Sequence, residues 1–211
     1  MKMSTLDGLV LGDVVHDADV MGALATIKPH AKSQNEAPWS LTLPNYVGNC
    51  KELGAHLRDL PGTIRLNCPS VTTVGEAAFE DCASLTHVKM GVHVVNRNAF
   101  KGCVKLKMVS MPGVKVIGEH AFSDCPALKT VLMGNVKSIE PGTFEECLEL
   151  TTLVVPTDVR STVLARIESE FQLLNIPRFD QFNVVKLKPE NGSEKPYANC
   201  YAIEYISKLG I

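Results

Sequence analysis

The sequence has no long apolar run and no excess of charge of either sign. Its apolar stretches are only a few residues long, whereas a helix needs about 18 apolar residues to cross a bilayer. Lys and Arg number 21 against 23 Asp and Glu, so a non-specific nucleic-acid binder, which needs a basic excess, is excluded. The hydrophobic fraction of 45% over 211 residues argues against disorder. These features predict a soluble, folded chain of one domain, or one domain with an elaborated end.

The N-terminal residues lack the marks of a targeting peptide. They have neither the long apolar core nor the small-residue cleavage site of a secretory signal. The first arginine is Arg58, and four aspartates precede residue 20, whereas transit peptides are rich in arginine and poor in acid. An intracellular, cytoplasmic location is therefore expected.

Motifs for catalysis, metal binding and cofactor binding are missing. The seven cysteines form no CxxC pair, and their odd number does not suit a disulfide scaffold. The six histidines form no HxxxH or HExxH pair, the spacing that marks one large class of zinc enzymes. The patterns GxSxG, GxxxxGK[ST] and GxGxxG do not occur either. We expect no catalytic residues, no metal, no cofactor and no small-molecule substrate.

Four phenylalanines recur at steps of 21, 22 and 22 residues. They are Phe79, Phe100, Phe122 and Phe144, followed three residues later by Cys82, Cys103, Cys125 and Cys147, and three further on by Leu85, Leu106, Leu128 and Leu150. A short apolar alternation such as Val109-Ser110-Met111 follows each leucine, and Val or Ile lies five and eight residues before each phenylalanine. Agreement in this many positions over four units identifies an internal repeat.

The spacing within each unit predicts its local structure. The apolar alternation is typical of a short half-buried strand. The Ala-Phe-x-x-Cys-x-x-Leu step places apolar groups three apart, which predicts one or two turns of helix facing the core. One unit cannot bury such a face, but stacked units form a continuous core. Residues 64–156 are therefore predicted to form an α/β repeat solenoid of about 22-residue units.

These units resemble the BspA-like (Treponema pallidum type) leucine-rich repeat, whose pattern is I-x-x-x-A-F-x-x-C-x-x-L-x-x-I-x-L-P. Residues 117–128 match it and continue through Val131 and Met133. Met111-Pro112 and Val155-Pro156 keep the terminal proline, whereas Met90-Gly91 and Met133-Gly134 do not. The resemblance implies a short leucine-rich-repeat solenoid whose surface binds other molecules, without shared catalytic residues. It also implies that the four repeat cysteines are small buried core positions rather than ligands.

The two flanks are predicted to cap the open ends of the solenoid. Residues 1–63 combine a helix over 17–27 with decayed repeat fragments at 41–44 and 50–53, and residues 53–63 are interpreted as an insertion. Residues 157–211 begin with a helix that ends before Pro177. Two strands follow, over 182–187 and 198–206, joined through an Asn191-Gly192 turn.

Charge is distributed unevenly within the units. Lysines occur on the strand side: Lys89, Lys107, Lys115, Lys129 and Lys137. Acidic residues occur on the helix side: Glu76, Glu80, Asp81, Glu119, Asp124, Glu145, Glu146 and Glu149. Acids near helix N-termini and lysines on exposed strands explain this pattern by stability and solubility alone. Orientation on a charged partner is the functional alternative.

The outward strand positions are the candidate binding site. They are His87 and Lys89, then Met108 and Ser110, then Thr130 and Leu132, then Thr152 and Val154. Polarity falls toward the C-terminus, so Met108, Leu132 and Val154 are expected to form an exposed apolar patch, which usually marks a contact. The charged rim is expected to be Lys89, Lys107 and Lys129. Two occupants stay open: another protein, or the chain's own C-terminal tail.

The sequence thus predicts a non-catalytic protein–protein interaction module. Its role would be that of an adaptor or an accessory subunit of a larger assembly, with other proteins as partners. One alternative is a secreted or surface adhesin, since the resembled family includes many. Another is an enzyme with a site in the terminal regions, where Cys50 or Cys200 would lie beside a histidine.

Overall fold

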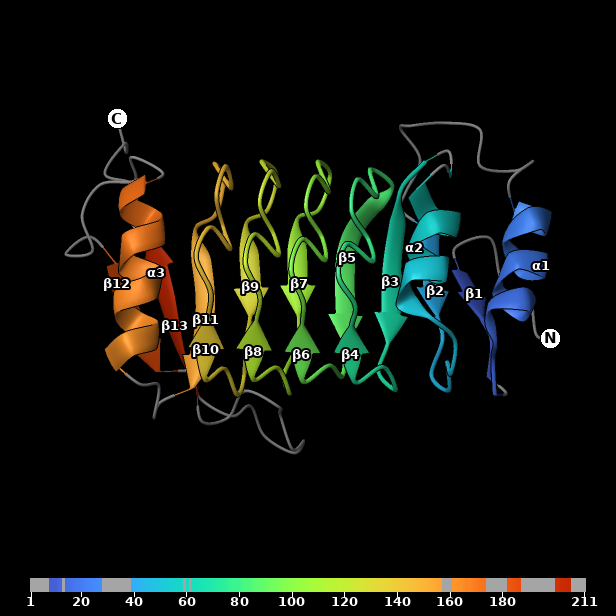
Figure 1. The fold of residues 1–211 in the computed structure, drawn as a ribbon, viewed down its shortest axis with the longest axis horizontal. Helices are drawn as coiled ribbons and strands as arrows, with labels where there is room; N and C mark the ends of the chain where they lie inside the picture. Colours follow the sequence, from blue (N-terminus) through green and yellow to red (C-terminus); the bar gives the residue numbers. More distant parts are fainter. Residues whose placement is uncertain are drawn as a thin grey trace.

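The computed structural model describes residues 8–12, 14–27, 39–58, 60, 62–156, 161–173, 182–186 and 200–205. The chain winds into coils that stack side by side along the long axis of the molecule (Figure 1). Helix α1 (Asp17–Ile27) lies near one end and α3 (Ser161–Leu173) near the other, and α2 (Cys50–Arg58) covers the coil next to α1 (Figure 1). Among the described helices, none is long and apolar enough to cross a membrane.

A nine-stranded sheet runs along the stack. In spatial order its strands are β1 (Gly8–Val10), β2 (Trp39–Thr42), β3 (Ile64–Cys68), β5 (Leu85–Met90), β7 (Met108–Ser110), β9 (Thr130–Leu132), β11 (Thr152–Pro156), β13 (Cys200–Tyr205) and β12 (Phe182–Lys186). The strands from β1 to β11 pair in parallel, one from each coil, and β13 and β12 continue the sheet in antiparallel pairing. The sheet therefore links the repeats to both flanking regions.

A second, smaller sheet runs parallel to the first. It consists of β4 (Thr73–Val74), β6 (Val94–Val95), β8 (Val116–Ile117) and β10 (Ser138–Ile139). The four coils that begin with β3, β5, β7 and β9 each contribute one strand to the large sheet and one to the small sheet. The segment that returns from the short strand to the next long strand, for example residues 96–107, is called the return segment below.

The core consists of equivalent side chains stacked from coil to coil. The rings of Phe79, Phe100, Phe122 and Phe144 lie parallel, with centroids 5.0, 5.3 and 6.0 Å apart, and each is at most 1% exposed. Val88, Val109 and Val131 form a matching buried row on the large sheet. The predicted repeat solenoid, with its step of about 22 residues, is confirmed.

The return segments are turns, not the helical turns predicted from the apolar spacing. In one such segment, the N–H groups of Lys101 and Cys103 donate to carbonyls three residues earlier in the same coil. The alternate N–H groups, of Phe100 and Gly102, donate to the carbonyls of Ala121 and Ser123 in the next coil, at 2.8 and 3.0 Å. Because every second donor is used between coils, the pattern of an α-helix cannot form.

Left-handed backbone accompanies this pattern at two positions in each return segment that contains a phenylalanine, two residues before and two residues after the ring. Those positions are Ala77, Asn98, His120 and Gly142 before, and Asp81, Gly102, Asp124 and Glu146 after, with φ between 52 and 71°. Such φ values are unfavourable for residues other than glycine. Five of the six non-glycine residues, namely Ala77, Asp81, Asn98, His120 and Asp124, are held there by their own N–H groups, which donate to carbonyls of the next coil.

The N-terminal flank continues the coil pattern with helices in place of turns. Helix α2 includes part of the 53–63 segment, which the sequence analysis interpreted as an insertion. That interpretation is wrong. Leu53 and Leu57 on α2 are fully buried, and the carbonyl of Gly54 accepts a hydrogen bond from the Cys82 thiol at 3.2 Å. In later coils a phenylalanine carbonyl takes that place. Helix α2 thus acts as the return segment of the coil that precedes the first phenylalanine.

The C-terminal flank contains α3 and the antiparallel pair β12 and β13. Val163 and Ile167 of α3 are buried, at 2% and 0% exposure. The predicted Asn191-Gly192 turn lies outside the described residues. The division into 1–63, 64–156 and 157–211 stays a prediction.

The left-handed positions lead to a stability prediction. Gly102→Ala should lower the free energy of unfolding by about 1–2 kcal/mol, because alanine is strained at positive φ. Its Cβ would also lie 2.1 Å from Asp81 Oδ1. Urea unfolding at 25 °C measures this change. Gly75→Ala is the control, since nothing lies within 4 Å of a Cβ there and its φ is not in the left-handed region. Equal losses in both variants would contradict the account of the turns.

Candidate functional site

Two rows of side chains point outward from the large sheet. The first row is Ser40, Arg65, His87, Met108, Thr130 and Thr152, and the second row is Thr42, Asn67, Lys89, Ser110, Leu132 and Val154. Each row runs across the strands because neighbouring coils pair in register. The two rows together are called the strand face below.

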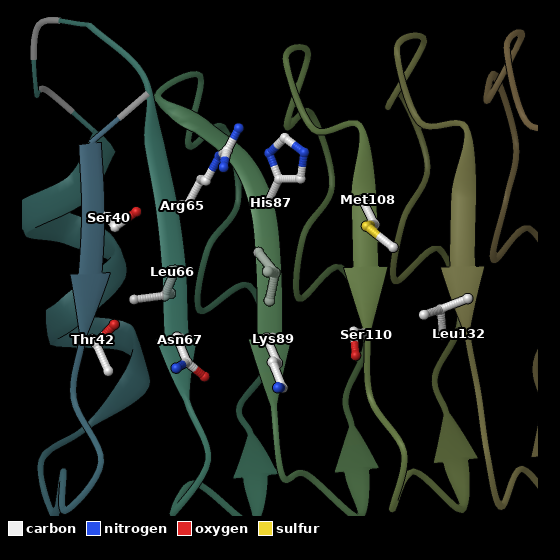
Figure 2. A pocket seen from close by; sticks show the side chains of 11 residues that line it. Ser40, Thr42, Arg65, Leu66, Asn67, His87, Lys89, Met108, Ser110 and Leu132 are labelled. Atoms are coloured by element: carbon white, nitrogen blue, oxygen red, sulfur yellow. The ribbon is translucent and has the colours of Figure 1, made fainter. Parts of the chain in front are cut away.

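A groove of about 390 Å³ lies on the strand face, across β2, β3, β5, β7 and β9. Figure 2 shows Arg65, His87 and Met108 along one side of it and Lys89, Ser110 and Leu132 along the other. Ser40, Thr42 and Asn67 complete the side chains at its β2 and β3 end. None of the described residues that line the groove carries a carboxylate. The groove thus carries its cations on β3 and β5 and its exposed apolar side chains on β7 and β9.

The structure brings three of the six predicted contact residues together. Met108 and Leu132 line the groove and are partly exposed, and Lys89 lines it and is exposed. Their role in binding stays a prediction. Figure 2 shows them projecting from neighbouring strands toward the same surface.

The expected exposure of Val154 is wrong, because its side chain is 3% exposed. Val154 is nevertheless separate from the cluster of buried side chains that forms the core. Strand β13 pairs with β11 and sets Ala202 beside Val154. Because the sheet continues past β11, Val154 does not lie at an open end of the second row, and it is not an accessible anchor.

Lys107 and Lys129 lie outside the groove. Each is the residue immediately before a strand, and the backbone N–H of Lys129 donates to the carbonyl of Lys107 at 2.9 Å. Both are exposed, and Lys129 Nζ lies 3.1 Å from Glu149 Oε2. They flank the strand face as a charged border.

Sequence reasoning missed the β3 contribution to the groove. The alternation Ile64-Arg65-Leu66 was available as a signal, because its middle residue alternates with two buried ones. Arg65 pairs with His87 across the sheet, and Asn67 pairs with Lys89. The groove therefore begins at β2, three strands before β7, where the predicted apolar patch begins.

His87 has a defined hydrogen-bond role in the groove. The Thr86 hydroxyl donates to the carbonyl of Ile64 at 2.9 Å, and His87 Nδ1 lies 3.1 Å from the same hydroxyl oxygen. Because the hydroxyl proton is already used, Nδ1 is the donor, which leaves the Nε2 lone pair as an acceptor. Burial and the nearby cations Arg65 and Lys107 hold the pKa of His87 below its ordinary value. The imidazole is therefore neutral at pH 7.

The repeat cysteines form a buried ladder that links coils. The thiols of Cys103, Cys125 and Cys147 donate to the phenylalanine carbonyls of the preceding coils at 3.1, 3.2 and 3.0 Å. All three are fully buried. Hydrogen bonding with Cys125 and burial raise the pKa of Cys103. No group of three or more metal-ligating side chains occurs among the described residues.

The thiol ladder leads to a second stability prediction. Cys125→Ala should lower the free energy of unfolding by about 1–2 kcal/mol, through a small cavity and a lost hydrogen bond. The control is Cys68→Ala, because Cys68 is equally buried and donates no hydrogen bond among the described residues. It should lose about half as much, since only the cavity remains. Chemical denaturation of both variants measures the two losses of unfolding free energy. A smaller loss for Cys125→Ala than for Cys68→Ala would refute a stabilising role for the thiol ladder.

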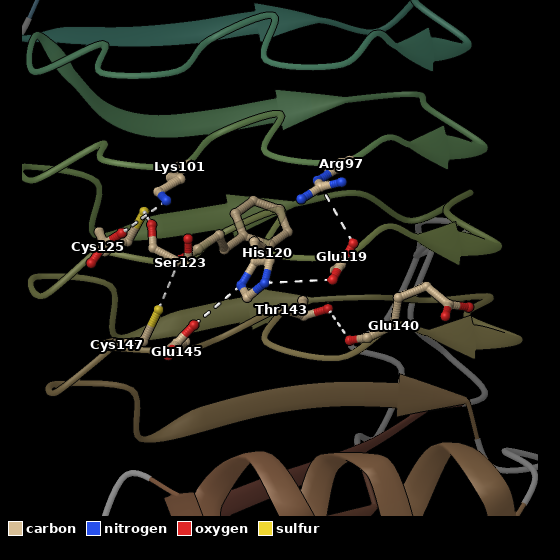
Figure 3. A network of polar contacts seen from close by, with 12 residues as sticks. Arg97, Lys101, Glu119, His120, Ser123, Cys125, Glu140, Thr143, Glu145 and Cys147 are labelled. Atoms are coloured by element: carbon tan, nitrogen blue, oxygen red, sulfur yellow. Dashed lines mark hydrogen bonds and ion pairs between the residues drawn. The ribbon is translucent and has the colours of Figure 1, made fainter.

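The return segments carry a polar network on the surface (Figure 3). His120 lies between Glu119 and Glu145: its Nε2 is 3.6 Å from Glu119 Oε1, and its Nδ1 is 3.1 Å from Glu145 Oε2. Arg97 lies 3.6 Å from Glu119, and Lys101 lies 3.7 Å from Asp124. Exposed pairs of this kind contribute little to stability. Their importance is the location of the acids, which lie on the return segments and not in the groove.

A second hollow of about 490 Å³ lies beside Cys50. Among the described residues, its lining contains Tyr46, Asn49 and Ser70 but no histidine. Burial, together with the charge of Asp17, raises the pKa of Cys50 to about 11. A thiol protonated at neutral pH is a poor nucleophile, so this hollow does not supply the chemistry that a cysteine enzyme needs. The side chain of Cys200 lies outside the described residues.

Three comparisons with known proteins complete the description. Residues 63–167 match the family model described as a BspA type leucine rich repeat region, in six copies. The crystal structure of the T. pallidum leucine rich repeat protein is similar at 26% identity and a TM-score of 0.43. That similarity covers 54% of this chain and 57% of the T. pallidum chain, so it spans little more than half of either. The curated proteins contain no match to this chain.

Proposed function

This chain belongs to the BspA-type leucine-rich-repeat family, whose repeats mediate protein–protein interaction, and we propose that it binds another protein through the strand face. The observation that carries the proposal is the groove, where partly exposed Met108 and Leu132 lie beside exposed Lys89. Apolar anchors bordered by polar and charged groups are the usual composition of a contact surface.

The rigidity of the surface supports this role. Strands β5, β7 and β9 are each bonded to a strand on both sides, and their inward residues Val88, Val109 and Val131 belong to the same buried core as the stacked phenylalanines. A surface held in this way loses little conformational entropy when a partner binds. The chain would act as an adaptor or accessory subunit that presents a fixed surface and carries out no reaction itself.

Affinity capture from native lysate, with quantitative mass spectrometry, tests the proposal. The captured amount of each specific partner should be at least about tenfold lower for the Met108→Asp/Leu132→Asp variant, because charge replaces the apolar anchors. The matched control is Val104→Asp/Leu148→Asp. These valine and leucine side chains are 47% and 62% exposed on the return segments, so the chemical change is the same on another face.

Both variants must first show the circular dichroism spectrum and melting temperature of a folded chain. Loss of partners in the strand-face variant alone supports the proposal. Loss in the control alone, or equal retention in both variants, would place the interface elsewhere and refute it.

A further inference from the structure

The charged and apolar side chains of the groove follow the same order in both rows. In the first row Arg65 on β3 is followed two strands later by Met108 on β7. In the second row Lys89 on β5 is followed two strands later by Leu132 on β9. Figure 2 shows this arrangement, with the cations toward β3 and the apolar groups toward β9. A cation and an apolar side chain therefore recur at one fixed separation.

That separation corresponds to a short stretch of extended peptide. Neighbouring strands lie about 4.8 Å apart, so two strands span about 10 Å. A segment in the polyproline II conformation advances about 3.1 Å per residue with three residues per turn, so side chains three residues apart lie on the same side and span about the same distance. A segment that crosses the strands can place an acidic side chain at a cation and an apolar side chain at Met108 or Leu132.

The charges around the groove favour an acidic occupant. Arg65 and Lys89 line it, Lys107 borders it, and its described lining includes no carboxylate. The charges that act on His87 from the neighbouring elements are Arg65 and Lys107, both of them cations. The acids of the repeats lie on the return segments, as Glu119, Asp124 and Glu145 illustrate. A basic segment would meet like charge in the groove, whereas an acidic one would meet opposite charge.

We infer that the groove binds an acidic segment of a partner protein in the extended polyproline II conformation, in which a carboxylate and an apolar side chain lie about three residues apart. This inference rests on the proposed function and specifies the partner's chemistry. Arg65 and Lys89 would each pair with a carboxylate of the segment. Met108 and Leu132 would cover its apolar side chains, and His87 Nε2 would face the bound carboxylate.

The position of His87 makes binding sensitive to pH. The free imidazole is neutral at pH 7, because burial, Arg65 and Lys107 lower its pKa. A carboxylate bound nearby would raise that pKa, so the complex takes up a proton more readily than the free chain. Affinity should therefore rise as the pH falls from 8 to 6. The carboxylates of the segment stay ionised in this range, since their ordinary pKa is about 4.

The test uses the full chain and an array of blocked synthetic peptides. Each peptide carries a Glu-Glu pair and one Leu, and the Leu is placed one to six positions from the pair, on either side of it. A second set of peptides replaces both Glu residues with Lys. The peptides with a separation of three should bind best, about tenfold tighter than their Lys counterparts. Equal binding of both sets, or binding that does not depend on the separation, would overturn the inference.

Charge reversal in the groove provides the matched variant. Arg65→Glu/Lys89→Glu should abolish peptide binding. Arg97→Glu/Lys101→Glu should retain it, because these two side chains, 58% and 41% exposed, lie on the return segments. Both variants change the net charge equally, so a non-specific attraction would weaken in both and contradict the inference. Sedimentation velocity of the native chain adds a check, because self-association lost in Arg65→Glu/Lys89→Glu would make a second copy the occupant.

The pH dependence of peptide binding tests the role of His87 directly. Affinity for the best peptide should rise between pH 8 and 6 in the native chain and stay flat in His87→Gln. A flat profile in the native chain would place the carboxylate away from this part of the groove and contradict the inference. Failure of the inference is distinguishable from failure of the proposed function. If no peptide binds while Met108→Asp/Leu132→Asp still loses its partners, the strand face binds something other than an acidic segment.

Discussion

Backbone hydrogen bonds between successive coils are the interaction on which the rest of the structure depends. They join the parallel strands of both sheets, and in the return segments every second N–H group also donates to the next coil. These backbone hydrogen bonds fix the step of about 22 residues. As a result, Phe100 stacks on Phe79, and the Cys103 thiol donates to the Phe79 carbonyl. A single coil could satisfy neither these backbone groups nor the apolar side chains, which is why the units are stable only as a stack.

The same register organises the outer surface. Strands that pair in step bring outward side chains into straight rows, so the chemistry of each coil becomes a position along the groove. Because outward residues do not contribute to the core, they are free to differ between coils. Cations on β3 and β5 are followed by apolar groups on β7 and β9, and many of the acids lie on the return segments. A uniform scaffold thus supports a surface that is specific along its length.

The sequence predicts those features that repeat. The 22-residue period placed the stacked phenylalanines, the buried cysteines and the inward strand residues, because each recurs at one position in every unit. It also placed Met108 and Leu132 on the strand face. The sequence could not distinguish a helix from turns in the return segments, because apolar residues three apart are compatible with both. The hydrogen bonds between coils determine that turns form. The burial of Val154, which accompanies pairing with β13, was not decided by the sequence, which left another protein and the C-terminal tail as alternative occupants of the patch. The strand of Arg65 lay within the predicted solenoid, but Arg65 was left out of the candidate site because the outward positions were listed only from His87 onward.

Amide hydrogen exchange of the native chain, followed residue by residue with NMR, tests the central claim that bonds between coils hold the stack in register. The amides of Phe100 and Gly102, which donate to the next coil, should be protected nearly as strongly as that of Val109 in β7. The amide of Lys101, which donates within its own turn at 3.1 Å, should exchange faster. Rapid exchange of Phe100 and Gly102, at the rate of an ordinary surface turn, would show that the return segments do not hold the coils together and would contradict the account.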